Sequence, residues 1–170
     1  GPSGSMIMSS GTSSSASTGF VTIGTGASTG GMAGDISVLG GITNSATGSG
    51  IYEIAGSTTK TSAVSGPVAI TTGLGYTAST GSMSLMTASA VSAGGSGNGF
   101  LFTGTVKSGS SGSISIYTGT SSFGNTGVVY IASGAATSGS SGSVSLLSGA
   151  TTSGPSGSMI MSSGTSSSAS

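Results

Sequence analysis

Apolar residues recur in pairs two positions apart along the chain, and a polar stretch follows each pair. Dividing the sequence after the glycine that ends each polar stretch gives ten units: 5–19, 20–34, 35–50, 51–66, 67–81, 82–99, 100–112, 113–127, 128–142 and 143–157. The units are 13 to 18 residues long, and 15 is the commonest length. A fixed period of this kind indicates a tandem-repeat protein.

The apolar pair occupies the second and fourth positions of a unit. The second position holds Met6, Val21, Ile36, Tyr52, Val68, Met83, Leu101, Ile114, Val129 and Val144. The fourth holds Met8, Ile23, Val38, Ile54, Ile70, Leu85, Thr103, Ile116, Ile131 and Leu146. Residues two apart share one face of an extended strand, and β-branched residues favour strands. Each unit is therefore predicted to contribute one short strand.

Two inward side chains cannot stabilise a strand alone, so each unit is expected to stack on its neighbours. The pattern predicts an all-β fold, a β-solenoid in which short strands of ~15-residue repeats stack parallel and in register within a long filament. Apolar residues at the first or the fifth position alternate almost regularly between units. This alternation leaves open whether one unit or two form each coil.

Glycine and hydroxyl residues hold fixed places in the units. The last residue is glycine in all ten units, and the sixth is Ser or Thr in eight. The last position is expected to form a corner with positive φ, which glycine adopts without steric cost. The sixth position is expected to place a row of hydroxyls that bond along the stack or to turn amides.

The chain repeats its own beginning. Residues 1–17 recur letter for letter as 154–170, so the ten units form a superrepeat of 153 residues. We interpret residues 1–170 as a single continuous solenoid segment of a longer array, with the ten units at 5–157.

Composition excludes most functional chemistry. The charged residues are Asp35, Glu53, Lys60 and Lys107, and the chain has no His, Cys or Trp. A serine nucleophile would lack its histidine base, and two cations are too few to track nucleic-acid phosphates. No apolar run approaches the roughly 18 residues that a membrane-spanning helix needs. We expect no enzyme, no catalytic, cofactor-binding or metal-binding residue, no cofactor, no nucleic-acid partner and no membrane span.

Two stretches carry a resemblance: SGSISIYTGTSSFGNTG at 111–127 and SGSVSLLSGATTSGPSG at 141–157. They resemble Ser/Thr/Gly-rich tandem-repeat β-solenoid proteins of extracellular surface fibres, hairs and adhesins of microalgal or bacterial type. The resemblance implies secretion to the cell surface, great length and a mechanical role. It transfers no site residue to this chain.

The leading function is a structural repeat segment of an extracellular filament, stalk or surface fibre, which provides length and stiffness. Its expected partner is itself, through stacked repeats and lateral assembly into filaments. The many Ser and Thr hydroxyls also predict O-linked glycans. An intact mass equal to that of the bare polypeptide would exclude these glycans.

Two other functions stay open. An adhesin or lateral-assembly module would use the aromatics Phe102, Tyr130, Phe123 and Tyr76. An ice-binding solenoid would need a regular outward array of threonines at the third position. That position reads Ile7, Thr22, Ser37, Glu53, Ala69, Ser84, Phe102, Ser115, Tyr130 and Ser145, with one threonine. The third position therefore disfavours ice binding.

Overall fold

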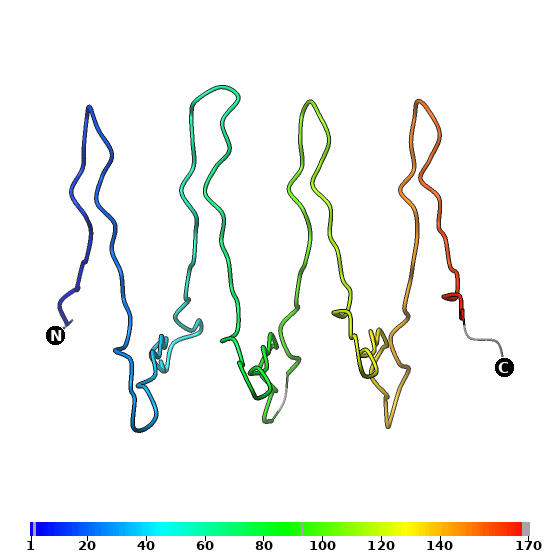
Figure 1. Cartoon of the computed structure of the whole chain (residues 1–170), viewed down its shortest axis with the longest axis horizontal. Coiled ribbons are helices and arrows are strands. Elements are labelled where there is room, and N and C mark those ends of the chain that lie inside the picture. The colour runs from blue at the N-terminus through cyan, green and yellow to red at the C-terminus, as the bar shows by residue number, and fades with distance from the viewer. Residues whose placement is uncertain (2, 93, 168–170) are drawn as a thin grey trace. The chain divides into compact units, whose positions relative to one another are not determined.

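The computed structural model describes residues 1, 3–92 and 94–167. None of these residues lies in a helix or a strand. The chain consists of extended segments joined by short bends (Figure 1). It divides into two halves, Gly1–Ser84 and Leu85–Ser170, and both contain the same local pattern of segment and bend.

The prediction of an all-β solenoid is wrong, because the described chain contains no strands. Among the described residues one hydrogen bond joins two backbone groups: the Gly66 N–H donates to the Gly56 carbonyl at 2.9 Å. The physical reason lies in the composition of a unit. Most of its residues are Gly, Ser or Thr. Ordering these residues costs backbone conformational entropy, and their small side chains bury little apolar surface in compensation. One apolar pair per unit does not hold the units in a stack.

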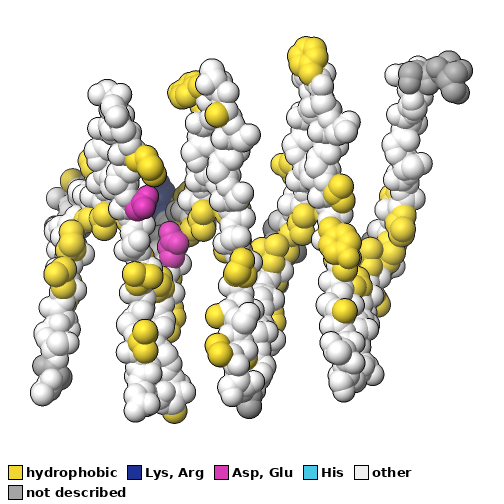
Figure 2. Space-filling view, turned by 90° about the horizontal axis from the view of Figure 1, so that it is seen from below, with side chains coloured by type: hydrophobic (Ala, Val, Ile, Leu, Met, Phe, Trp, Pro, Cys, Tyr) yellow, Lys and Arg dark blue, Asp and Glu magenta, His cyan; other side chains and the backbone are white. Residues whose placement is uncertain are grey.

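The described chain has no buried core. Its accessible surface is 16878 Å², whereas a folded monomer of 15.5 kDa would expose about 7,200 Å² and its extended chain about 22,500 Å². Among the described residues no hydrophobic side chain is buried. Figure 2 shows hydrophobic side chains on the surface of the chain. The apolar residues are therefore available to contacts beyond their own unit.

Exposure alternates along some of the apolar segments, such as the one that contains Val129. Val129, at a second position, is 48% exposed, whereas its neighbours Val128 and Tyr130 are each 85% exposed. Successive side chains of an extended segment point to opposite sides. In this unit the second position therefore faces its own chain more than the first and third positions do, whereas in the unit 51–66 the second position, Tyr52, is more exposed than Ile51 before it.

Bends recur at the spacing of the units. They lie at 14–16, 29–31, 44–47, 60–62, 76–78, 91–94 (residues 91, 92 and 94 described), 107–109, 122–124, 137–139 and 152–154. One bend falls in each of the ten units, and in eight units it ends three residues before the last glycine. The extended residues on either side of a bend are called its arms below.

Hydroxyl side chains in the polar stretch hold several bends. Ser13, Ser28 and Ser121 accept hydrogen bonds from the amides of Ala16, Gly31 and Gly124 at 3.0, 3.1 and 3.0 Å. These serines occupy the ninth position of their units. A serine hydroxyl that bonds a nearby amide is a common way to fix a turn in a loop. Turn-bonding hydroxyls therefore occur at the ninth position of these units, whereas the repeat pattern predicted them at the sixth.

Positive φ occurs within the bends and not at the last glycine of a unit. Gly94, Gly109, Gly139 and Gly154 have φ of 123°, 106°, 98° and 98°, and all four lie in bends. The expectation that the last glycine forms a left-handed corner is therefore wrong. The left-handed turn is made three residues earlier, at the last residue of the bend, in three of these four cases.

In five of the ten units the last glycine instead lies against the opposite arm, whereas a Cβ at Gly81, Gly99 or Gly157 would have open space. The position that a Cβ would take at Gly127 is 3.4 Å from Thr118 Cγ2, and at Gly112 it is 3.5 Å from Thr103 Cγ2. The same nine-residue pairing joins Gly19 to Ser10, Gly34 to Thr25 and Gly142 to Ser133. Among the described residues, Ala55, Gly75, Thr103 and Thr118 are the least exposed. Three of these four residues, Thr103, Thr118 and Ala55, lie where the two arms approach each other.

The shortest unit, 100–112, preserves this pairing. Its fourth position is Thr103, where nine of the ten units carry an apolar residue. Thr103 stands nine residues before Gly112, the separation at which the arms meet in the 15-residue units. The threonine therefore takes the place of the sixth-position residue, and its methyl group meets the glycine.

Candidate functional site

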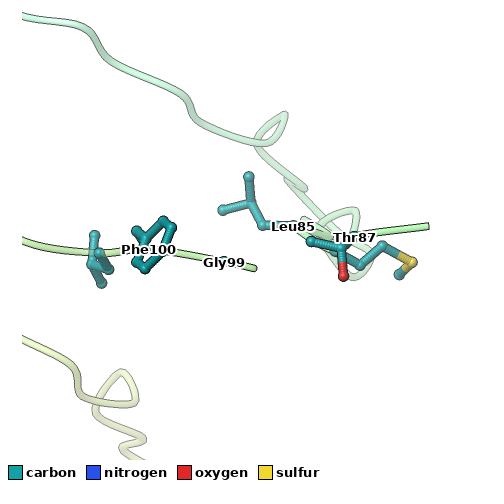
Figure 3. A pocket seen from close by; sticks show the side chains of 6 residues that line it. Leu85, Thr87, Gly99 and Phe100 are labelled. Carbon is teal, nitrogen blue, oxygen red and sulfur yellow. The ribbon is translucent and has the colours of Figure 1, made fainter. Parts of the chain in front are cut away.

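The Leu85–Ser170 half contains an apolar hollow. Two stretches of chain line it: Leu85, Met86 and Thr87 on one side, and Gly99, Phe100 and Leu101 on the other. The cavity volume is about 740 Å³. Figure 3 shows Leu85 and Phe100 coming from these separate stretches, and the polar loop of the 18-residue unit connects them in sequence. The lining groups can contact apolar groups but offer no acid or base for catalysis.

The Phe100 ring is oriented by a second aromatic residue. The rings of Phe100 and Phe102 have their centroids 6.4 Å apart and their planes at 69°. An edge-to-face pair of this kind is favoured by the quadrupoles of the two rings. The pair gives the hollow one wall that is both apolar and oriented.

The other aromatics that the sequence analysis singled out lie elsewhere in the chain. Phe123 is in the bend at 122–124 and is 103% exposed. Tyr76 begins the bend at 76–78 and is 91% exposed. Tyr130 lies in an extended segment, also exposed. Of the four aromatics proposed for partner contact, only Phe102 lies beside the hollow, through its ring contact with Phe100.

The bend that carries Tyr76 requires a glycine. A Cβ at Gly75 would collide with the carbonyl oxygen of Ala78, a backbone atom that cannot move aside without opening the bend. Gly73, two residues earlier, has open space at the same place. The glycines of this unit are therefore not equivalent, and Gly75 sets the path of the chain before Tyr76.

No metal-binding cluster of three or more His, Cys, Asp or Glu residues occurs among the residues that the structure describes. Within the same residues, no helix is long and apolar enough to cross a membrane. Comparison of the chain with known protein families, curated proteins and solved structures finds no match.

Sequence reasoning missed the hollow. Its residues were assigned to the core columns of a stack, Leu85 at a fourth position and Leu101 at a second. One signal in the sequence marks the place: the longest unit, 82–99, directly precedes the shortest, 100–112. A long polar loop followed by a shortened arm allows two apolar stretches to lie near each other without packing closely.

Proposed function

We propose that this chain is a structural repeat segment of an extracellular filament, stalk or surface fibre, in which its task is to provide length. The observation that carries the proposal is the exact recurrence of residues 1–17 at 154–170, which makes the ten units one period of an array. The composition supports it, because two acidic and two basic residues and no histidine offer almost nothing for catalysis.

The contacts within the chain support an additive role. The hydrogen bonds between separate positions span short distances in sequence, such as Ser49 Oγ to the Gly41 carbonyl at 2.8 Å and the Thr58 amide to Ser65 Oγ at 3.4 Å. Because each unit makes its contacts within itself, every further unit adds its own length to the chain. The contour length of the chain is then proportional to the number of units.

The experiment is a length series. Tandem proteins with one, two and three copies of residues 5–157 are expected to show a radius of gyration that rises at least ~1.9-fold from one copy to three, as for an expanded chain. A stiff rod would give a rise of about threefold. Small-angle X-ray scattering at low concentration measures the radius. A rise of only ~1.5-fold, as for a compact globule, would contradict the proposal.

A second function is favoured by a specific observation. The exposed aromatics Phe123 and Tyr130 suit an adhesin or lateral-assembly module, since aromatic residues are enriched at protein interfaces. Such a module would work within the same filament and requires no further chemistry.

A further inference from the structure

Two apolar features of the Leu85–Ser170 half are not used by a spacer role. One is the hollow between residues 85–87 and 99–101, which is open to solvent. The other is Phe123, whose whole ring is exposed at the bend 122–124. Both present apolar surface to water, which is unfavourable unless another apolar surface covers it.

The bend holds Phe123 in an exposed position. Ser121 accepts a hydrogen bond from the Gly124 amide at 3.0 Å, which closes the bend around Phe123. The residues next to Phe123 are Ser122 and Gly124, which are small and leave the ring accessible. Other exposed apolar residues near bends include Met32, Ile42, Val64, Tyr76 and Val91. Phe123 is the largest wholly apolar side chain among them.

The hollow and the ring are chemically complementary. Leu85, Met86, Phe100 and Leu101 provide an apolar lining with one aromatic ring, and neither the hollow nor the bend at 122–124 contains a charged residue. A phenylalanine ring packs favourably on another ring and on a methionine sulfur. Its insertion would desolvate no charge. The chain has a net charge of zero, so two copies do not repel each other.

We propose that the hollow formed by residues 85–87 and 99–101 receives the Phe123 side chain of a second copy of this chain. The inference rests on the proposed filament function and deepens it by naming the partner and the contact. The contact joins two different surfaces: the hollow of one copy and the Phe123 side chain of the other. A head-to-tail contact of this type generates an open fibre unless its rotation closes a ring.

The repeat makes a second copy a suitable partner. One period of 153 residues contains a single hollow sequence and a single Phe123. In a longer array the hollow and Phe123 therefore each recur every 153 residues on both chains. Once one contact forms, the next hollow and the next Phe123 are held at a raised effective concentration, so linked contacts strengthen one another.

The test is sedimentation velocity of the full 170-residue chain over a range of concentrations. The wild-type chain is expected to associate as concentration rises. Phe123→Ser and Phe100→Ser are each expected to weaken association by at least about tenfold, because each removes a large apolar group from the contact. The matched control is Tyr76→Ser, which removes an exposed bend aromatic outside the contact and is expected to leave association within about threefold of wild type.

Mixing the two variants tests the head-to-tail geometry. The Phe123→Ser chain keeps an intact hollow, and the Phe100→Ser chain keeps an intact Phe123. Each is expected to remain monomeric alone, and an equimolar mixture is expected to form dimers that do not grow further. If association came from nonspecific contacts between exposed apolar residues, the mixture would instead show the average association of the two variants alone.

Three results would overturn the inference: a wild-type chain that stays monomeric, variants that associate as strongly as wild type, or a mixture that does not pair. The proposed function is tested separately by the length series in dilute solution. A Phe123→Ser chain that loses association but keeps its length per copy would separate the contact from the spacer role. If the length series fails while association is intact, the proposed spacer function is rejected and the Phe123 contact is retained.

Discussion

Backbone amides in the dilute chain are expected to exchange with deuterium at close to the rates of an unstructured peptide, throughout both halves. The described residues form no strand or helix and bury no hydrophobic side chain, so solvent reaches nearly every amide. Slower exchange is expected at the hydrogen-bonded amides, such as Gly66 and Gly124, but by no more than about tenfold, because these residues are exposed. Mass spectrometry of peptides after timed labelling measures these rates.

A stacked core would give a very different result. Core amides that open only by global unfolding are protected by the full stability of the domain, and even 5 kcal/mol corresponds to about several thousandfold slower exchange. Protection of that size in the monomer would show that the chain has a core and would contradict the architecture described above. The labelling is run at a concentration where sedimentation shows a monomer. Protection that appears only at higher concentration reports association.

The arms of a bend can be linked by an engineered disulfide. The position of a Cβ at Gly127 lies 3.8 Å from Thr118 Cβ, which is close to the typical Cβ separation in a disulfide, about 3.8 Å. The double variant Thr118→Cys with Gly127→Cys is therefore expected to close an intramolecular disulfide readily. The chain has no cysteine of its own, so no other thiol competes. Equilibration with glutathione and mass spectrometry measure the oxidised fraction.

A pair of equal spacing provides the control. Asn125 and Gly134 are also nine residues apart, but a Cβ at Gly134 has no atom within 4 Å outside its immediate neighbours. Equal spacing gives equal loop-closure entropy, so any difference between the pairs reports the approach of the arms. We expect the Thr118–Gly127 pair to be favoured by at least about tenfold, or ~1.4 kcal/mol. Equal oxidation of both pairs would mean that the arms do not stay together.

A second facing pair makes the disulfide test general. The position of a Cβ at Gly142 is 3.9 Å from Ser133 Cβ, in the next unit along the chain. The Ser133→Cys with Gly142→Cys variant should oxidise like the first pair. Agreement between the two would establish that the arm contact belongs to the repeat and does not depend on one threonine.

Local features of this chain were accessible from its sequence. The period of about 15 residues and the polar character of each second half are visible in the letters, and one bend lies within the polar half of each unit. Turn chemistry depends on residues a few positions apart, so composition constrains it well. The details still differed: the left-handed glycines are those of the bends, such as Gly109 and Gly139, and not Gly112 and Gly142.

Long-range packing was not accessible in the same way. The apolar pairs were assigned to columns shared by neighbouring units, yet Val129 is half-exposed and its neighbours Val128 and Tyr130 are largely exposed. An alternating pattern predicts which side chains share a face, but it does not predict which surface covers that face. The same pattern suits the next unit of the chain or another copy. The hollow at 85–87 and 99–101 was missed for this reason.

The sequence by itself determined the repeat, the place of the polar stretches, and the near absence of charged and catalytic groups. Only the tertiary structure decided that the described residues form no strand, that the last glycine meets the opposite arm in five of the units, and that Phe100 lines an open hollow. The physical reason is the range of the interactions. A bend is stabilised by hydrogen bonds within one unit, whereas a core needs apolar contacts between units, and one pair per unit leaves those contacts unspecified.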